Sequence, residues 1–417
     1  MAVPKAPRRI AMLVALILPV LAVPGPASAS GGCGSSDGHT LCVTAPADPL
    51  SGEVQIQITN VSNSGKVIVT WRPSGGSAVY LITRSRPSPQ TNDYSFVWPT
   101  QKYRDGAGVL RVQHGSTSKT PIDVPVTLSN GNASGFDHNP NDWADFLPGP
   151  WTASADPVVV ASGDGPADEA APNGLAASIA ATDPALFLFL GDIYEQGTFT
   201  ENRNAYGVSA LDGTTGTLWG ALAAKTMPAL GNHEAPRAVD WTDYWHGRPR
   251  FTSLRFGGVL FLDLDSNAPM GSGSAQYTFV QGQLATAPPC VVAFWHAPVL
   301  SNDSVSSSRL PMWSLLANNG GDLVLNGHRH SMAEYRPLTA SLQLGGHMVE
   351  LISGAGGHSL GKGVTDSHGR LQWTLGKVAG AAYLTLNGAA NGGTASSIDW
   401  VFRDVNHAAR QSGSVTC

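Results

Sequence analysis

Charged residues are scarce in this chain of 417 residues, and basic residues do not outnumber acidic ones. Charged side chains make up 13 % of the sequence, while 48 Gly and 29 Pro predict abundant loops on a polar surface. With 25 Lys and Arg against 30 Asp and Glu, the chain lacks the basic surface that nucleic acids require. A Gly-x-Ser-x-Gly elbow and a Walker loop are also missing, so serine hydrolases and nucleotide-driven proteins have no support.

Long apolar runs are missing too, except near the N-terminus. Lys5, Arg8 and Arg9 precede an apolar stretch over 11–23, and small residues over 27–29 follow it. This order predicts a signal peptide over residues 1–29. The stretch is too short for a transmembrane helix. We therefore expect a secreted, extracellular protein without membrane insertion.

Only four cysteines are present, and export would place them in an oxidising compartment. Cys33 and Cys42 are close in sequence and suited to staple the N-terminus. A bridge between Cys290 and Cys417 would pin the C-terminal tail to the core. Four cysteines allow three pairings, and the sequence alone does not choose among them.

The first half of the chain shows the period-two pattern of β-strands. Residues 54–58 alternate cleanly between apolar and polar side chains, and further short runs recur between Gly-, Asn- and Pro-rich turns up to about residue 130. We predict a small all-β sandwich over residues 30–130, which resembles a bacterial immunoglobulin-like module. Nothing in it suggests catalysis, so weak contact with a surface or polymer is the expected role. A polar, Gly- and Pro-rich linker is predicted over 131–150.

From residue 151 to 417 the pattern changes to short, continuous apolar runs, which suit strands buried on both faces. Helix-compatible segments over 175–181 and 310–317 separate some of them, so we predict an α/β domain. In such sheets, ligands bind beyond the carboxyl ends of the strands. The runs cover residues 157–161, 186–190, 259–264, 291–295, 323–325 and 349–352.

Five polar segments lie at or next to the ends of apolar runs, in a fixed order. Aspartate, asparagine and histidine together suit a pair of divalent or trivalent ions, which is a common device for phosphoester hydrolysis. Alone, Asp164 would equally suit a turn and His296 a buried core position. Their place in the ordered set favours metal binding. The segments are Gly163-Asp164, Gly191-Asp192-Ile193-Tyr194, Gly231-Asn232-His233-Glu234, Trp295-His296 and Gly327-His328-Arg329-His330.

On these segments, residues 158–358 resemble the calcineurin-like metallophosphoesterases, and most of all the bacterial relatives of purple acid phosphatases. The resemblance implies an αββα sandwich and two metal ions, with iron paired with zinc, manganese or a second iron. Asp192 would bridge both ions. The residues that it implies as metal ligands are Asp164, Asp192, Tyr194, Asn232, His296, His328 and His330.

The same resemblance implies a mechanism in which a metal-bound hydroxide attacks a phosphate ester. His233 would be the general acid beside the leaving group, with Asp192 as the second catalytic residue. Glu234 or another carboxylate is expected to orient the His233 ring. His358, in a Gly-rich segment, is a candidate for substrate contact, whereas Asp263 and Asp265 fit no motif and are interpreted as turn or supporting groups.

Three departures from the family pattern stand out. Gly165 and Pro166 follow Asp164, where many relatives carry a histidine. Tyr194 lies two residues after Asp192, one residue short of the usual spacing for the tyrosine ligand of purple acid phosphatases. The segment 332–334 replaces a Tyr-Glu-Arg stretch that often follows the last histidine motif.

The expected substrate is a small phosphate monoester. A monoesterase would use cationic groups for the spare phosphate charges, and Arg203, Arg237 and Arg329 lie near motif loops. A phosphodiesterase or nucleotidase of the same fold is the alternative within the enzyme class. A non-catalytic surface-binding protein is less favoured, because a decayed enzyme should have lost ligands.

Overall fold

The computed structural model describes residues 30–36, 39–59, 67–85, 93–114, 121–133, 143–165, 174–207 and 219–417. The predicted signal peptide, residues 1–29, lies outside the described residues. So do Pro166 and residues 134–142 of the predicted linker. Among the described residues, no helix has the length and apolar composition needed to cross a membrane.

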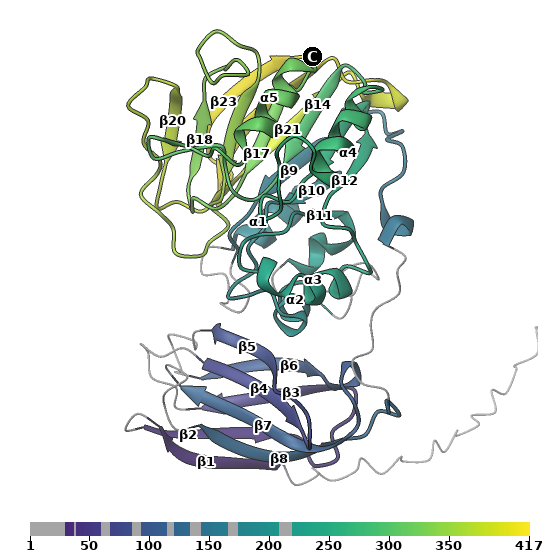
Figure 1. Ribbon diagram of the computed structural model, residues 1–417, viewed down its shortest axis with the longest axis vertical. Coiled ribbons are helices and arrows are strands. Elements are labelled where there is room, and N and C mark those ends of the chain that lie inside the picture. Colours follow the sequence, from purple (N-terminus) through teal and green to yellow (C-terminus); the bar gives the residue numbers. More distant parts are fainter. Residues whose placement is uncertain are drawn as a thin grey trace, which may run out of the picture.

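Eight strands between residues 30 and 128, called the N-terminal module below, form two antiparallel four-stranded sheets. Figure 1 shows them as the separate layer pair below the rest of the chain. The first sheet has the order β1 (Ser30–Ser36), β2 (His39–Ala45), β3 (Glu53–Thr59) and β6 (Tyr94–Pro99). The second has the order β5 (Val79–Ser85), β4 (Val67–Pro73), β7 (Gly106–His114) and β8 (Ile122–Leu128).

One hydrophobic core joins these two sheets. Alternate residues of β3, including Ile56 and Ile58, are fully buried, as the period-two pattern predicts. Trp71 of β4 packs against Trp98 of β6, with ring centroids 5.3 Å apart. Large side chains from both sheets therefore meet in one core. The two packed sheets are confirmed, while the immunoglobulin-like assignment stays a prediction.

The rest of the chain contains two larger mixed sheets. The six-stranded sheet has the order β11 (Thr226–Pro228), β10 (Leu186–Phe189), β9 (Val158–Ser162), β21 (Gly380–Asn387), β22 (Ser397–Asp404) and β23 (Ala409–Thr416). The seven-stranded sheet has the order β12 (Thr252–Phe256), β13 (Val259–Asp263), β14 (Cys290–Phe294), β17 (Leu323–Asn326), β19 (Val349–Ser353), β18 (Met332–Tyr335) and β20 (Leu371–Leu375). Neighbours within β9 to β11, and within β13, β14, β17 and β19, run parallel.

Helices cover the outer faces of both sheets, so the layers follow the order helix, sheet, sheet, helix. In β9, Val159 and Ala161 enter the core between the sheets, whereas Val160 enters the core under the helices. The helices on that side are α1 (Leu175–Ala181), α2 (Phe199–Tyr206) and α3 (Ala238–Tyr244). The opposite side is covered by α4 (Ala275–Leu284) and α5 (Leu310–Asn318) (Figure 1). The predicted α/β pattern is thereby confirmed, including the two helices expected over 175–181 and 310–317.

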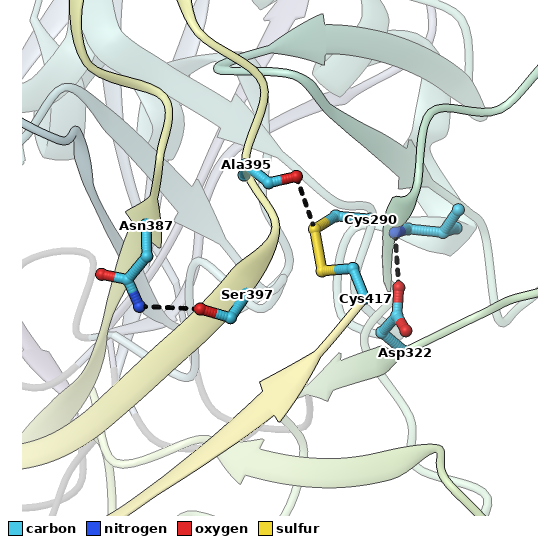
Figure 2. Close-up of a disulfide and its surroundings, with 7 residues drawn as sticks. Cys290, Asp322, Asn387, Ala395, Ser397 and Cys417 are labelled. Carbon is cyan, nitrogen blue, oxygen red and sulfur yellow. Dashed lines mark hydrogen bonds between the residues drawn. A yellow bond between two sulfur atoms is a disulfide. The ribbon is translucent and has the colours of Figure 1, made fainter.

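Both disulfides suggested by the sequence are present. Cys33 and Cys42 face each other across β1 and β2. Cys290, the first residue of β14, is bonded to Cys417, which directly follows β23 (Figure 2). The second bridge therefore ties the last strand of the six-stranded sheet to the middle of the seven-stranded sheet. Two disulfides are consistent with an extracellular protein.

Candidate metal centre

Seven predicted ligands lie in loops that follow the carboxyl ends of five parallel strands. The loops follow β9, β10 and β11 in one sheet and β14 and β17 in the other. Because the carboxyl ends of parallel strands meet at one edge, these loops converge on a single site. The residues brought there are Asp164, Asp192, Tyr194, Asn232, His296, His328 and His330.

Three of these side chains gather around the hydroxyl group of Tyr194. The hydroxyl oxygen lies 3.2 Å from Asp164 Oδ1, 3.2 Å from Asp192 Oδ2 and 2.7 Å from His330 Nε2. His330 Nε2 is itself 3.4 Å from Asp164 Oδ1. The shortened spacing between Asp192 and Tyr194 therefore does not prevent the phenol from reaching the other residues of the group.

A second group gathers around Nε2 of His296. This nitrogen lies 3.0 Å from Asn232 Oδ1, 3.1 Å from His328 Nδ1 and 3.1 Å from Asp192 Oδ2. Among the described residues, Asp192, His296 and His328 also offer ligand atoms that all lie within 4.8 Å of one another. Asp192 Oδ2 belongs to both groups, which places one carboxylate between two clusters of donor atoms.

Backbone carbonyls hold the rings of His296 and His330 through their Nδ1 atoms. Nδ1 of His296 donates to the carbonyl of Leu190 at 2.8 Å, and Nδ1 of His330 donates to that of Ser359 at 3.1 Å. A carbonyl can only accept, so each neutral ring turns the lone pair of Nε2 towards the site. For His296 that lone pair faces the oxygen atoms of Asp192 and Asn232. Such converging acceptors fit a cation, which would bind them all.

The pKa values reflect this concentration of charge in a buried place. Burial alone would lower the pKa of His296, but the Asp192 carboxylate raises it to about 9. Burial, and then the positive charge of His296, lower the pKa of His328 to about 3. Burial would raise the pKa of Asp192, but His296 and His233 hold it well below its usual value. The groups respond strongly to one another's charge, as expected in a shielded cluster.

Four of the predicted ligands have left-handed backbone conformations. Asp164 has a φ of 59°, Asp192 of 63°, His328 of 70° and His330 of 43°. For residues other than glycine such conformations cost of order 1–3 kcal/mol each and concentrate at functional sites. These conformations therefore lower the stability of the fold, but they direct the four side chains towards the same site.

Glycines make room for the two carboxylates. A Cβ atom on Gly231 would lie 2.1 Å from Asp192 Oδ1, and one on Gly354 would lie 2.6 Å from Asp164 Oδ2. Both distances are far below van der Waals contact. A larger residue at either position would displace the carboxylate, so these motif glycines are needed for space.

His233 lies at the edge of the site, next to Asp192. Its backbone N–H donates to Asp192 Oδ1 at 2.9 Å, and its Nε2 lies 3.9 Å from Asp192 Oδ2. Its Nδ1 donates to the backbone carbonyl of Glu195. The side chain is 34 % exposed, which leaves Nε2 accessible to a substrate.

Glu234 does not orient the His233 ring, contrary to the sequence-based expectation. Its carboxylate is buried and accepts backbone N–H groups of Asp192 at 3.0 Å, Gly231 at 2.8 Å and Ile193. Because it joins the loops after β10 and β11, Glu234 stabilises the backbone beneath Asp192. No sequence signal pointed to the carbonyl of Glu195, because every residue has a backbone carbonyl whatever its side chain.

His358 lies against the tyrosine. Its ring stacks on that of Tyr194, with centroids 3.6 Å apart and planes inclined by 16°. Its backbone N–H donates to the carbonyl of Asp164 at 3.1 Å. The residue singled out in the Gly-rich segment thus lies in contact with the first donor group.

The three arginines near motif loops separate into different roles. Arg203 pairs with Glu53 of the N-terminal module, and the Arg237 guanidinium lies 4.9 Å from the centroid of the Tyr80 ring. In the sequence, Arg329 lies between His328 and His330. Its Nε is buried without a hydrogen-bond partner among the described residues. Nε of Arg309, at the start of α5, is in the same condition, and the charges of both arginines lower the pKa of His328. No sequence motif pointed to Arg309.

Groups outside the motifs have supporting roles. Asp263 forms a buried ion pair with Arg248 at 2.8 Å. Asp265 accepts the backbone N–H of Asn267 at 2.7 Å, and the Asn267 amide donates to the carbonyl of Gly231 at 3.2 Å. Both aspartates therefore behave as turn or supporting groups, as expected.

The segment that replaces Tyr-Glu-Arg forms β18. Its Glu334 accepts a hydrogen bond from Trp400 Nε1 at 3.2 Å, across to the other sheet. In this chain the segment therefore joins the two sheets.

Comparison with known proteins agrees with this site. Residues 168–332 match the profile of the family described as calcineurin-like phosphoesterase, a stretch that begins after Asp164 and includes the motifs from Asp192 to His330. The chain therefore carries a calcineurin-like metallophosphoesterase domain, a kind of domain that uses a dinuclear metal centre.

Solved structures and curated proteins complete the comparison. The chain is similar to purple acid phosphatase PPD1 from yellow lupin (Lupinus luteus) seeds, with 14 % identity, 91 % of this chain and 79 % of that chain covered, and a TM-score of 0.49. It is also similar to PhoD, with 12 % identity, 90 % and 88 % covered, and a TM-score of 0.42. No curated protein matches the sequence.

Proposed function

We propose that this protein is a secreted phosphoesterase with two metal ions that hydrolyses phosphate monoesters. One observation carries the proposal: Asp192 Oδ2 lies 3.2 Å from the Tyr194 hydroxyl in one donor group and 3.1 Å from His296 Nε2 in the other. A carboxylate shared by two complete sets of ligands is what a pair of bridged ions requires.

The ligand sets fit two ions of different character. The first ion would be held by Asp164, Asp192, Tyr194 and His330, and the second by Asp192, Asn232, His296 and His328. A phenol among the first set favours iron(III) there, with zinc, manganese or a second iron beside it. Ions bound in this way supply Lewis acidity to the phosphoryl oxygens and a nucleophile at moderate pH.

His233 is assigned the role of general acid. Because Nδ1 donates to the Glu195 carbonyl, the ring turns Nε2 towards the space next to Asp192. In the imidazolium form, the proton on Nε2 would pass to the leaving oxygen of the ester as its bond to phosphorus breaks. Asp192 accepts the backbone N–H of His233 at 2.9 Å and so holds the acid near the ligands.

A monoester is favoured over a diester by the positive charges of Arg329 and Arg309, both of which act on His328. A phosphate monoester carries more negative charge than a diester, so these two charges would attract it more strongly. A phosphodiesterase or nucleotidase of the same fold is the alternative. A purely binding role is disfavoured, because none of the seven ligands is missing.

The same proposal includes the domain limits and the location. Residues 1–29 are a signal peptide, 30–130 an immunoglobulin-like sandwich, 131–150 a linker and 151–417 the catalytic domain. The N-terminal module would add weak contact with a surface or polymer, and neither nucleic acid nor membrane insertion is involved. The two disulfides support export.

Hydrolysis of p-nitrophenyl phosphate and of its bis-ester by the protein from residue 30 onward, loaded with metal, tests the function. Asp192→Asn should lower turnover at least about a hundredfold, since it removes the negative charge of the shared ligand. Asp399→Asn, on the exposed face of β22, is the matched control and should keep full activity. The faster of the two esters decides between monoesterase and diesterase. Bound metal without turnover on either ester, at any pH tried, would contradict the proposed function.

A further inference from the structure

The N-terminal module contacts the helix that follows the Tyr194 loop. α2 begins right after Thr198, four residues beyond Tyr194, and contacts β5 and β6, the edge strands of the two module sheets (Figure 1). Edge strands have free backbone groups, and α2 uses them. Thr198 Oγ1 donates to the carbonyl of Leu81 at 2.7 Å in a buried place.

Asn204 makes a paired contact with the other edge strand. Its amide oxygen accepts the backbone N–H of Val97 at 3.0 Å, and its amide nitrogen donates to the carbonyl of Val97 at 3.2 Å. One side chain thus satisfies both backbone groups of an edge residue, as a neighbouring strand would. This fixes α2 relative to β6 in direction as well as in distance.

A bidentate ion pair stands next to these hydrogen bonds. Arg203 Nε lies 2.7 Å from Glu53 Oε1, and Arg203 Nη2 contacts Glu53 Oε2. The Arg203 side chain is 11 % exposed and that of Glu53 is 25 % exposed, so the pair lies at the partly exposed rim of the contact. Bidentate arginine–carboxylate geometry is the strong form of such a pair. This contact engages Arg203, which is thereby removed from the candidates for phosphate binding.

From α2, hydrogen bonds continue into the loop that carries Tyr194. Thr198 and Glu201 form a capping box at the start of the helix. Glu201 Oε2 accepts the backbone N–H of Thr198 at 3.0 Å and that of Gln196 at 3.2 Å. The residue before Gln196 is Glu195, whose carbonyl accepts Nδ1–H of His233. Hydrogen bonds and the backbone between them therefore link the N-terminal module to α2, α2 to the Tyr194 loop, and this loop to His233.

We propose that the N-terminal module positions the loop 194–198, with Glu53 and Arg203 as positioning residues for Tyr194 and His233. They touch neither substrate nor metal ligand and act through α2. The inference rests on the proposed function where it concerns turnover, but not where it concerns the order of the loop. It gives the module a task in catalysis besides any contact with surfaces or polymers.

The order of the loop is tested by amide hydrogen exchange on the full protein from residue 30 onward. In Arg203→Glu, the amides of Gln196 and Thr198 should exchange about tenfold faster, which corresponds to roughly 1.4 kcal/mol. The double variant Glu53→Arg with Arg203→Glu should restore slow exchange by reversing the pair. Glu53→Gln, a milder change, should give an intermediate rate and covers the case in which Arg203→Glu does not fold.

The chain offers a matched control pair within the module. Arg111 on β7 and Asp123 on β8 form another bidentate contact, with Nε 2.7 Å from Oδ1 and Nη2 2.7 Å from Oδ2. Arg111→Glu should leave exchange in the loop unchanged. Equal rates in Arg203→Glu and the wild type, or equal acceleration in Arg111→Glu, would overturn the proposal.

Turnover provides the second readout, because a misplaced general acid matters most for a poor leaving group. Arg203→Glu should lower kcat about tenfold for an alkyl phosphate and clearly less for p-nitrophenyl phosphate, with KM little changed. Equal losses on both esters would overturn positioning of His233. A wild-type protein without any turnover would instead contradict the proposed function, and the exchange rates would still decide whether the module orders the loop.

Discussion

At the scale of single residues, Tyr194 shows how geometry can override spacing. Its position one residue short of the family pattern made it the least secure ligand from sequence. In the structure its hydroxyl is the point at which Asp164, Asp192 and His330 meet. Burial, and then the two carboxylates, raise the pKa of Tyr194 well above its usual value. Only a strongly acidic cation would bind it as phenolate, which is the reason for proposing iron(III) in the first site.

Tyr194→Phe should therefore weaken metal binding at the first site by at least about tenfold, while binding at the second site changes little. Loaded with iron, the wild type should show a visible tyrosinate-to-iron band that the variant lacks. Metal content after dialysis and the absorption spectrum measure both effects. Tyr383→Phe is the control, because the Tyr383 hydroxyl is buried without a partner among the described residues. Unchanged metal content in Tyr194→Phe would remove this residue from the ligands.

The sequence predicted side chains at the centre better than it predicted their supports. Asp192, Asn232 and His296 are recognisable because their residue types and order point to metal binding. The carbonyl of Glu195 has no such signature, and the assignment of Glu234 to the His233 ring was wrong for that reason. Arg309 was missed because it belongs to none of the five motif segments, although its charge acts on His328.

At the scale of elements, β19 supports the loop that carries His296. Its Glu350 is fully buried and accepts the backbone N–H of Val299 at 2.7 Å and that of Leu300 at 3.1 Å. Val299 lies three residues after His296. Leu300 is the first residue of the short strand β15 (Leu300–Ser301). Burial raises the pKa of Glu350 to about 8, although the two N–H donors lower it in part.

This pKa predicts a pH dependence of stability. Between about 4.5, the usual value, and about 8, the folded state keeps a proton that the unfolded state releases. Stability should therefore fall as pH rises through this window, by up to about 1.4 kcal/mol per pH unit from this group. Glu350→Gln cannot titrate, so its free energy of unfolding should rise relative to that of the wild type from pH 5 to pH 8.

Urea denaturation at several pH values measures this difference, and effects of metal loss shared by both proteins cancel in the comparison. Asp399→Asn, a change at an exposed carboxylate of β22, should run parallel to the wild type. A Glu350→Gln curve that also runs parallel to the wild type would show that burial does not hold the proton on this carboxyl group.

At the scale of the whole molecule, the change in periodicity coincides with a change in the kind of sheet. Alternation predicted the sheets of the N-terminal module, and continuous apolar runs predicted the doubly covered strands of the second half. Strand order across the two large sheets was not predicted, because pairing such as β21 with β9 joins residues far apart in sequence. The contact of β5 and β6 with α2 was not predicted either, since Leu81 and Val97 contribute only backbone atoms.

The two disulfides should contribute unequally to the stability of the whole chain. Cys290 and Cys417 close a loop with a sequence separation of 127, and Cys33 and Cys42 one of only 9. Fewer unfolded conformations survive when a longer loop is closed, so the chain-entropy description assigns about 5 kcal/mol to the first bridge and about 2.5 kcal/mol to the second. The first bridge also anchors β23, an edge strand whose side chains are all at least partly exposed.

We therefore expect the double variant Cys290→Ala with Cys417→Ala to lose more free energy of unfolding than Cys33→Ala with Cys42→Ala. Urea denaturation with and without a reductant measures both losses. Reductant should destabilise the second variant by about 5 kcal/mol, because it keeps the longer bridge, and the first variant by only about 2.5 kcal/mol, because it keeps the shorter one. A larger loss in the N-terminal variant would mean that the short cross-strand bridge, and not the anchor of β23, limits the stability of the molecule.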